Sequence, residues 1–558
     1  MIHLTGKNFR LPAIKLTANQ LLLLTSLYFT LILNQPFLSG FIGAIIKLPQ
    51  YQTLFLLSVP FLLFGLMTLL LSIFSIRYLM KPVFIVLTLV STLVFYGTLN
   101  YGVVFDYGMI QNSVESHSAE AMSYLNAELL MFFLAFGVLP SLFIYHVKIN
   151  YQSFPKELYQ RAKLSALTLS SVCLIAYVFY PSYSAVARNN SHLTKYIVPS
   201  QYLSSGYKFA RDSLFYSDTT FTIIDAKPTL VMSEPEVKRV TVMVVGETAR
   251  AKSFSYNGYS KATNQFTQPY NIISFQDMQS CGTATAVSVP CMFSSLTRDD
   301  FDRRVADNQQ NLLDLVDLAG VDVLWIDNNG CKGVCARVPT IKIDANQDDP
   351  LCDGEYCQDG ILLKPLADKL NNLTAPSTLI VLHMMGSHGP TYYKRYPENH
   401  TVFEPECARS DIQNCSSEQL LNTYDNTIAY TDFVLSKVIE NLAALPENIA
   451  TSMLYVSDHG ESLGESGAYL HGFPYALSPE EQRAIPLLVW LPKQESKQQC
   501  LQNIASTQDF NHDYIFHSML GLLSVQSTRY QQPLDIFSQC SSPLNDPELQ
   551  LSKTEEAK

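Results

Sequence analysis

The sequence predicts a protein in two parts: a helical transmembrane domain with five spans, followed by a soluble α/β domain whose sheet has helices on both faces. Three observations support this fold class. Hydrophobic residues make up 47% and charged residues 16% of the 558 positions, which is more apolar than an average soluble protein. Long apolar runs end near residue 185. Beyond that point, short β-branched runs alternate with helical patterns, as they do in sheets covered by helices.

Five segments of the first part are long and apolar enough to cross a bilayer, which requires roughly 20 residues in a helix. These segments are 18–34, 53–75, 82–101, 124–146 and 163–183. A shorter apolar run at 37–48 follows Pro36, so we expect an interfacial or re-entrant helix there. The first span lacks a small-residue cleavage site after it and is expected to remain as an anchor.

Basic residues concentrate in alternate connections between these spans. The connections at 35–52 and 102–123 contain only Lys47. The N-terminal segment and the second and fourth connections are basic; they carry Lys7, Arg10, Lys15, Arg77, Lys81, Lys148, Lys156, Arg161 and Lys163. The positive-inside rule then predicts a cytoplasmic N-terminus, and five spans place everything after residue 185 outside the cytoplasm.

Cysteine usage agrees with an exported second part. Ten of the 11 cysteines lie there, and Cys173 lies in a predicted span. An even number in an exported domain indicates disulfides, although the sequence does not determine their connectivity. Pairing between neighbours is expected: Cys281 with Cys291, Cys331 with Cys335, Cys352 with Cys357, Cys407 with Cys415, and Cys500 with Cys540. A zinc site at Cys331 and Cys335 is the alternative, but a second pair at zinc-finger spacing is missing.

The predicted domains follow these patterns. They are a membrane domain at 1–185, a connector with an interfacial helix at 186–236, a catalytic domain at 237–540 and a polar tail at 541–558, which is expected to fray. The net charge of −11 comes without a basic stripe, so nucleic acid is not an expected partner. The chain is expected to act as a monomer.

Short apolar runs at 237–245, 321–326, 377–383, 451–456 and 485–491 are predicted strands. Helical patterns between them, at 308–319, 361–372 and 417–444, predict a parallel sheet. Polar residues follow four of the strands directly. Because the carboxyl ends of parallel strands meet at one edge of a sheet, we expect these residues to form one site. They are Glu247, Asp327, Asn328, Asn329, Lys332, His383, His388, Asp458 and His459.

Three of these strand-end residues suit a metal ion. Asp458 and His459 offer an oxygen and a nitrogen side by side, and Glu247 adds a second carboxylate from another strand end. Zinc accepts this mixture of ligands, and a fourth position would remain for a nucleophile. The alternative is that Asp-His-Gly forms an ordinary turn, since aspartate often begins turns.

Thr285 is the candidate nucleophile. It lies where a glycine-containing loop is predicted to enter a helix, between Cys281 and Cys291. A helix N-terminus attracts anions, and metal coordination favours the alkoxide that attacks phosphorus. Taken alone, Thr283 and Thr285 would be interpreted as helix caps. The assignment of Thr285 therefore depends on the metal ligands from the other strand ends.

Two further histidines lie in loops flanked by glycine or proline, His388 and His471. Such residues bind a second metal, contact the transferring phosphoryl group or protonate the leaving alkoxide. Exposed loop histidines are the alternative. Asn329 and Lys332 suit the non-bridging oxygens of a phosphate.

Six segments carry a resemblance to a known family: GETAR at 246–250, SCGTATAVSVPCMFS at 280–294, DNN and CKGVC within 327–335, HMMGSHGP at 383–390, YDNTIAYTD at 424–432 and SDHGESLGE at 457–465. Together they resemble the phosphoethanolamine transferases that modify lipid A, which include the mobilised colistin-resistance enzymes. The resemblance runs through nearly the whole chain. It implies five spans in the bacterial inner membrane, followed by a periplasmic alkaline-phosphatase-like domain.

The resemblance also implies roles for individual residues. Tightly bound catalytic zinc is implied at Glu247, Thr285, Asp458 and His459, and Thr285 would carry the covalent phosphoethanolamine. Phosphoryl-group binding, or a second zinc, is implied at Asn329, Lys332, His388 and His471. The segment at 106–121 resembles a loop over the active site, which implicates Asn112, Ser116 and Glu120 in substrate binding. Ser116 stands where relatives often have threonine.

The implied reaction consists of two displacements. Thr285 attacks phosphatidylethanolamine and releases diacylglycerol, and a lipid A phosphate then takes the phosphoethanolamine. The added amine would weaken binding of cationic peptides such as polymyxin. One alternative is transfer to the heptose or Kdo of the lipopolysaccharide core. Others are a lipoteichoic-acid-type polymerase, a membrane sensor and a sulfatase-like hydrolase. A sulfatase-like hydrolase requires a C/S-x-P-x-R pattern, and Ser288-Val-Pro-Cys-Met292 has the proline but lacks the arginine.

Overall fold

The computed structural model describes residues 14–47, 52–115, 118–215, 220–232, 237–492 and 494–540. The chain divides into two compact units. The first comprises Met1–Asp106 and Leu125–Lys208, and the second comprises Tyr107–Tyr124 and Phe209–Lys558. The domain boundaries proposed from the sequence stay predictions. The tail from residue 541, and Lys7 and Arg10 of the basic N-terminal segment, lie outside the described residues.

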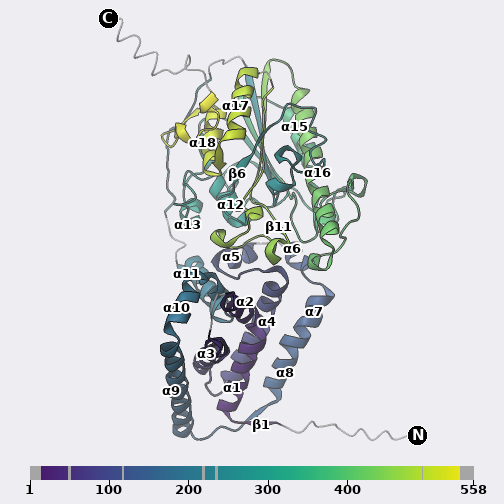
Figure 1. Ribbon diagram of the computed structural model, residues 1–558. Helices are drawn as coiled ribbons and strands as arrows, with labels where there is room; N and C mark the ends of the chain where they lie inside the picture. Colours follow the sequence, from purple (N-terminus) through teal and green to yellow (C-terminus); the bar gives the residue numbers. More distant parts are fainter. Residues whose placement is uncertain are drawn as a thin grey trace, which may run out of the picture. The chain divides into compact units, whose positions relative to one another are not determined.

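The first unit is built from helices (Figure 1). Among the described residues, four helical segments are long and apolar enough to cross a membrane, or five if the bent pair Ala18–Leu33 and Gln35–Ile46 counts as one span. The four are α3 (Thr53–Ser72), α4 (Met80–Tyr101), the segment Ala127–His146 and α9 (Phe154–Val178). Within Ala127–His146, α7 (Ala127–Phe133) and α8 (Leu139–His146) flank a π-helical turn at Leu134–Val138. The predicted membrane domain is confirmed in its fold class.

The shorter helix that was expected at 37–48 is α2, Gln35–Ile46. It follows α1 (Ala18–Tyr28) and a π-helical turn at Phe29–Leu33, with an angle of 62° between the two helical segments. Asn34 lies at the bend, where its side chain donates to the carbonyl of Val198 at 2.7 Å and accepts from its N–H at 2.9 Å. A proline at the start of α2 fits the first helical turn, where its missing N–H is not needed.

Two helices follow α9, namely α10 (Tyr180–Asn189) and α11 (Ser200–Phe215). The helix α11 falls in the predicted connector, and its relation to a membrane surface stays a prediction. Close packing joins α3 and α9, because a Cβ placed on Gly65 would lie 2.5 Å from Val172 Cγ2. Small residues allow such close approach of helices in membrane proteins.

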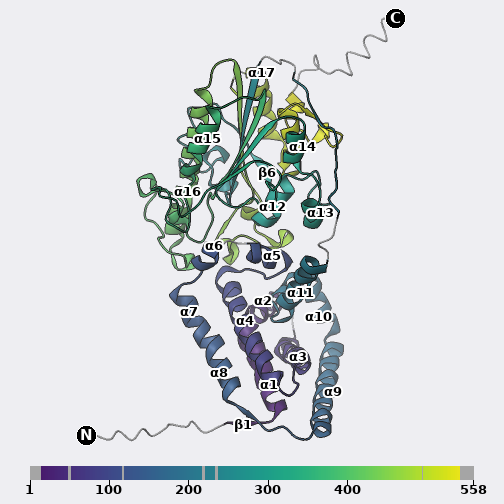
Figure 2. The same ribbon diagram turned by 180° about the vertical axis from the view of Figure 1, so that it is seen from behind.

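A seven-stranded sheet forms the core of the second unit, with strand order β5-β13-β10-β4-β9-β7-β8 (Figures 1 and 2). Five neighbouring strands are parallel: β10 (Ile449–Ser457), β4 (Lys238–Gly246), β9 (Ser377–His383), β7 (Asp322–Asp327) and β8 (Thr340–Lys342). Strand β13 (Leu487–Trp490) is antiparallel to β10, and β5 (Ile273–Phe275) is antiparallel to β13.

The fully parallel sheet predicted from the sequence is therefore wrong at β13. A parallel neighbour requires a long crossover connection, usually a helix. The described chain between β10 and β13 contains only the short strands β11 (Ser462–Leu463) and β12 (Tyr469–Leu470) and 3-10 turns. Without a crossover helix, the chain returns along the sheet in the opposite direction.

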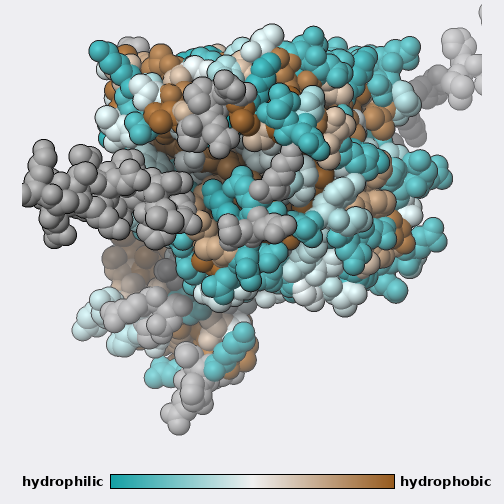
Figure 3. All heavy atoms as spheres, turned by 90° about the horizontal axis from the view of Figure 1, so that it is seen from above, coloured by the Kyte–Doolittle hydropathy of each residue, from teal (hydrophilic) through white to brown (hydrophobic). Residues whose placement is uncertain are grey.

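Helices cover both faces of the sheet (Figures 1 and 2). One face carries α15 (Leu363–Leu370) and α16 (Ser417–Ala443). The other carries α12 (Thr285–Met292), α14 (Leu312–Leu318), α17 (Glu495–Thr507) and α18 (Asp513–Leu522). The predicted helical patterns at 308–319, 361–372 and 417–444 thus correspond to α14, α15 and α16. The outer face in Figure 3 is mainly hydrophilic with scattered hydrophobic residues, as in soluble proteins.

All five neighbour disulfides expected from the sequence are present: Cys281–Cys291, Cys331–Cys335, Cys352–Cys357, Cys407–Cys415 and Cys500–Cys540. Cys173 is a free cysteine in α9. Because Cys331 and Cys335 are bonded to each other, neither supplies the thiolate that a zinc site would need.

Candidate functional site

Thr285 is the first residue of α12, and Ala284 is the N-cap residue. The hydroxyl does not cap the helix, because α12 has no side-chain cap. Instead Thr285 Oγ1 donates toward the Glu247 carboxylate, at 3.0 Å from Oε1 and 3.1 Å from Oε2, and lies 3.3 Å from His459 Nε2. The helix-capping interpretation of Thr285 is therefore not supported by this arrangement.

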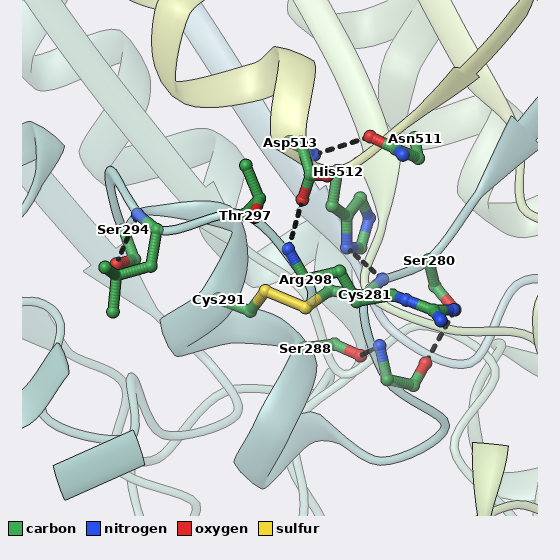
Figure 4. Close-up of a disulfide and its surroundings, with 12 residues drawn as sticks. Ser280, Cys281, Ser288, Cys291, Ser294, Thr297, Arg298, Asn511, His512 and Asp513 are labelled. Atoms are coloured by element: carbon green, nitrogen blue, oxygen red, sulfur yellow. Dashed lines mark hydrogen bonds between the residues drawn. A yellow bond between two sulfur atoms is a disulfide. The ribbon is translucent and has the colours of Figure 1, made fainter. Parts of the chain in front are cut away.

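The loop before Thr285 is held by contacts on both sides. The Gly282 N–H donates to Ser288 Oγ at 3.1 Å, and the Cys281–Cys291 disulfide joins the loop to α12 (Figure 4). Thr283, the second candidate helix cap, donates its hydroxyl to the Phe473 carbonyl. These contacts fix the loop that presents Thr285.

Glu247, Asp458 and His459 lie together because of strand register. The last residues of β4 and β10, Gly246 and Ser457, are directly paired in parallel, which places the residues that follow them side by side. All three side chains are fully buried, and their ligand atoms lie within 4.8 Å of one another. His459 Nε2 is 3.4 Å from Glu247 Oε1 and 3.3 Å from Asp458 Oδ2.

The hydrogen bonds of the two carboxylates leave one oxygen for a cation. Asp458 Oδ1 accepts from the N–H of Thr248 at 3.0 Å and of His459 at 2.7 Å. Asp458 Oδ2 is buried and has no hydrogen-bond partner among the described residues. A buried carboxylate oxygen without a donor is unfavourable unless a cation compensates it. The two carboxylates, the imidazole and the Thr285 hydroxyl form a donor set that fits zinc.

Burial and neighbouring charges shift the pKa values of both carboxyl groups in this cluster. Burial, reinforced by the Glu247 carboxylate, raises the pKa of Asp458 to about 7. Burial opposes ionisation of Glu247 as well, but the His459 imidazole holds the pKa of that carboxyl well below its usual range. Two neighbouring carboxylates repel each other when both are ionised, and a bound divalent cation would offset this repulsion.

A second set of side chains adjoins this cluster. The ring centroids of His459 and His471 are 4.4 Å apart, and those of His388 and His471 are 5.4 Å apart. His471 Nδ1 lies 2.9 Å from Glu461 Oε2, and Tyr392 donates its hydroxyl to the other Glu461 oxygen. Both predicted histidines are therefore buried beside the metal cluster, and neither is an exposed loop residue.

The sequence interpretation missed Glu461. It is fully buried, and burial raises its pKa to about 8. Its contact with His471 Nδ1 orients that imidazole. The available signal was its position two residues after His459 in the SDHGES segment.

Asn329 and Lys332 occupy different positions around the site. Asn329 Nδ2 donates to Glu247 Oε2 at 2.6 Å, so the amide holds one carboxylate of the Glu247, Asp458 and His459 cluster in place. Lys332 Nζ donates to the Glu115 carbonyl at 3.1 Å. Arg303 bridges the same region, with its guanidinium 3.4 Å from Glu115 Oε2 and donating to the Lys332 carbonyl at 2.9 Å. Neither Glu115 nor Arg303 was identified from the sequence.

A cavity of about 1020 Å³ opens next to these residues. Its lining includes Asn329, Lys332, Arg303, Glu115 and Met122. Asn329 thus belongs both to the lining of this cavity and, through its hydrogen bond to Glu247, to the surroundings of the Thr285 cluster.

The predicted substrate loop contributes α5 (Tyr107–Glu115) and α6 (Ser118–Ser123) to the second unit. A Cβ placed on Gly472 would lie 3.3 Å from Met109 Sδ, so α5 lies close to the loop that carries His471. Asn112 is buried in α5. Ser116 and the side chain of Glu120 lie outside the described residues, and the roles of these three residues stay predictions.

His383 does not join the metal cluster. Its Nδ1 lies 2.9 Å from Asp327 Oδ1, and both residues are buried. Asp327 also accepts from the N–H groups of Gly330 at 2.9 Å and Cys331 at 3.1 Å. The Asp327–His383 pair thus shapes the loop that positions Asn329, and these two side chains contact each other and do not contact Glu247, Asp458 or His459 in any described hydrogen bond.

Comparison with known proteins agrees with this architecture. The family model described as "Phosphoethanolamine transferase EptA/EptB" matches residues 63–214, and the one described as "Sulfatase" matches 239–525. Phosphoethanolamine transferase EptA of Escherichia coli K12 is 38% identical over 93% of this chain and 96% of its own length. Phosphatidylethanolamine transferase Mcr-1 of Escherichia coli is 37% identical over 85% of this chain and 89% of its own.

A solved structure shows the same fold over both units. The integral membrane protein lipooligosaccharide phosphoethanolamine transferase A (EptA) from Neisseria meningitidis has a TM-score of 0.90 and 35% sequence identity. The match covers 95% of this chain and 100% of that structure. The shared fold, the extent of the sequence matches and the convergence of Thr285 with Glu247, Asp458 and His459 agree. This chain belongs to the phosphoethanolamine transferase family.

Proposed function

We propose that this chain transfers phosphoethanolamine from phosphatidylethanolamine to a phosphate of lipid A, through a covalent ester on Thr285. The observation that carries the proposal is the position of Thr285 Oγ1, 3.0 Å and 3.1 Å from the Glu247 oxygens and 3.3 Å from His459 Nε2. A buried hydroxyl that donates to a carboxylate and lies beside an imidazole is the arrangement of an activated nucleophile. The membership of a transferase family supports the same reaction.

Glu247, Asp458, His459 and Thr285 would hold one zinc ion, and His388 with His471 is the candidate position for a second. When bound, zinc would lower the pKa of the threonine hydroxyl and offset negative charge on the phosphoryl oxygens. Asn329 holds the Glu247 carboxylate in place from outside the ligand set.

In the first displacement, the Thr285 hydroxyl gives its proton to the Glu247 carboxylate, toward which it donates, as Oγ1 forms a bond to phosphorus and the bond between phosphorus and the diacylglycerol oxygen breaks. The leaving alkoxide takes a proton, and His388 and His471, whose rings adjoin each other and His459, are the candidate donors. In the second displacement, an oxygen of the acceptor phosphate attacks phosphorus, and Thr285 Oγ1 leaves and regains its proton. Two displacements on one nucleophile predict ping-pong kinetics.

The two-part architecture supports lipid substrates. Segments long and apolar enough to span a membrane occupy the first unit, and five disulfides lie in the second unit, as expected for a domain exported from the cytoplasm. We place the chain in the inner membrane with a cytoplasmic N-terminus and a periplasmic catalytic unit. A sulfatase-like hydrolase is less consistent with the site, because the Ser288 hydroxyl is buried in α12 and accepts from Gly282 N–H.

Lipid A mass spectrometry tests the acceptor. Cells that express the wild-type chain should produce lipid A carrying phosphoethanolamine and should survive higher polymyxin concentrations. Cells that express Thr285→Ala should show neither change, whereas the surface variant Thr507→Ala on α17 should match the wild type. Unmodified lipid A together with phosphoethanolamine on heptose or Kdo would contradict the proposed acceptor. Full lipid A modification by Thr285→Ala would contradict the proposed nucleophile.

Metal analysis tests the cofactor. The purified full-length chain should contain one tightly held zinc, and a chelator should abolish release of diacylglycerol from phosphatidylethanolamine until zinc is restored. A second zinc that binds more weakly and disappears in His388→Ala would support the additional position. Full activity in chelated, metal-free protein would refute the site.

A further inference from the structure

His512 connects the two halves of the catalytic cluster without touching the reacting atoms. It follows β14 (Asp509–Asn511), which pairs in parallel with β6 (Asp277–Gln279). This pairing places His512 beside the start of the nucleophile loop, and its N–H donates to the Gln279 carbonyl at 3.1 Å. The side chain is 1% exposed. Figure 4 shows the His512 ring against the backbone of Cys281, next to the Cys281–Cys291 disulfide.

The imidazole makes one hydrogen bond at each ring nitrogen. The N–H of Cys281 donates to His512 Nδ1 at 3.0 Å. His512 Nε2 lies 3.0 Å from the Ser457 carbonyl, which accepts. A backbone N–H only donates and a carbonyl only accepts, so the ring must be the neutral tautomer with its hydrogen on Nε2. Burial agrees, because it lowers the pKa of His512 to about 4.

The two backbone groups joined by this ring belong to opposite sides of the site. Cys281 opens the loop that leads to Thr285, and Ser457 directly precedes Asp458 and His459. The Ser457 side chain is fixed as well, since its hydroxyl donates to the His459 carbonyl at 2.9 Å and accepts from Ala249 N–H at 2.9 Å. The imidazole is therefore a rigid spacer between the loop of the nucleophile and the strand of the ligands.

We propose that His512 is a positioning residue for the transfer reaction, whose imidazole sets the distance between Thr285 and the Asp458–His459 pair. The inference rests on the proposed function. Reactions that depend on a placed nucleophile are sensitive to small displacements, and a shift of about 1 Å lowers the rate by roughly 100-fold. Both ring nitrogens of the buried His512 are already hydrogen-bonded to backbone groups, so its loss should change kcat while leaving KM nearly unaltered.

The chain offers a matched control. His517 lies in α18, the helix that begins directly after His512, and is 2% exposed. It accepts from the Gln531 N–H at 3.2 Å through Nδ1, and burial lowers its pKa to about 4. Its substitution removes a buried imidazole and a backbone hydrogen bond of the same kind. It does not alter the link between Cys281 and Ser457.

The test uses purified full-length protein and phosphatidylethanolamine with a fluorescent acyl chain. His512→Leu removes both contacts. His512→Asn keeps an acceptor near the Cys281 N–H, and His512→Gln keeps a donor near the Ser457 carbonyl. We expect kcat for diacylglycerol release to fall by roughly 100-fold in His512→Leu, with KM within about 3-fold of the wild type. The Asn and Gln variants should recover part of this loss. His517→Leu should lose similar thermal stability but keep kcat within about 2-fold, because the cluster geometry is unchanged.

Each other outcome overturns the inference. Wild-type kcat in folded His512→Leu, an equal loss in His517→Leu, or full recovery of His512→Leu by added zinc would exclude a positioning role. Failure of all three His512 variants to fold would assign the residue to folding alone. Wild-type protein that releases no diacylglycerol would instead contradict the proposed function, which separates the two failures.

Discussion

Asn329 offers a direct test of how the Glu247 carboxylate is held. Its Nδ2 donates to Glu247 Oε2 at 2.6 Å, and both side chains are buried. Asn329→Ala removes this donor and leaves a charged oxygen with only the Thr285 hydroxyl as its hydrogen-bond partner among the described residues. A hydrogen bond to a charged group contributes about 1.5–3 kcal/mol. Since about 1.4 kcal/mol corresponds to tenfold, kcat/KM should fall by roughly 10- to 150-fold.

Part of this effect should appear as weaker metal binding, because groups that orient a metal ligand typically change affinity by about 10- to 100-fold. The assay combines competition with a fluorescent zinc chelator and donor-cleavage kinetics at saturating zinc. Asn441→Ala is a suitable control, since Asn441 Nδ2 donates to the Lys437 carbonyl within α16, away from the cluster. Unchanged zinc affinity and unchanged kcat/KM in Asn329→Ala would refute the reasoning.

Three further predictions concern other parts of the second unit. Burial lowers the pKa of His517 to about 4, so the unfolded state binds more protons than the folded state between about pH 6.5 and 4. The free energy of unfolding should therefore fall by at most about 3 kcal/mol as the pH drops through this window, and melting curves of His517→Asn should show a smaller loss. Gly386 has φ +53°, and an added Cβ would lie 2.5 Å from the Glu247 carbonyl oxygen, so Gly386→Ala should reduce the zinc content and the activity. The control Gly467→Ala should retain both, because Gly467 has φ +78° but open space around an added Cβ. A disulfide that closes a longer loop restricts the unfolded chain more. Removing Cys500–Cys540, with a separation of 40 residues, should therefore lower the free energy of unfolding by about 4 kcal/mol, and removing Cys407–Cys415, with a separation of 8, by about 2.5 kcal/mol. Equal losses in denaturant titrations would contradict this argument.

The strands and the candidate metal ligands were predicted from local patterns. Apolar runs identified β4, β7, β9 and β10, and the polar residues directly after β4 and β10, namely Glu247, Asp458 and His459, lie together in the structure. This prediction does not require the strand order in the sheet, because parallel strands bring their carboxyl ends to one edge in any order. His383 instead contacts Asp327, because these two residues are directly paired at the ends of the neighbouring strands β9 and β7.

Other features depended on contacts between distant segments. The antiparallel direction of β13 follows from a connection without a crossover helix, and α5 belongs with the second unit although it lies between helices of the first in sequence. Glu115, Arg303 and Lys332 come together only through that placement. A local sequence pattern cannot predict these contacts, because the three residues are far apart in the sequence.

The sequence by itself was enough to predict the division into membrane and soluble parts and the presence of disulfides, and to identify the residues after the central strands, because each depends on composition or spacing within a short stretch. Only the tertiary structure decided which of those residues meet and what holds them there. His512 shows the difference: it lies 231 residues from Cys281 and 55 from Ser457, and its two hydrogen bonds exist because the β6–β14 pairing brings both backbones to one imidazole. Strand register, and not local pattern, brings Thr285 beside Glu247 and His459.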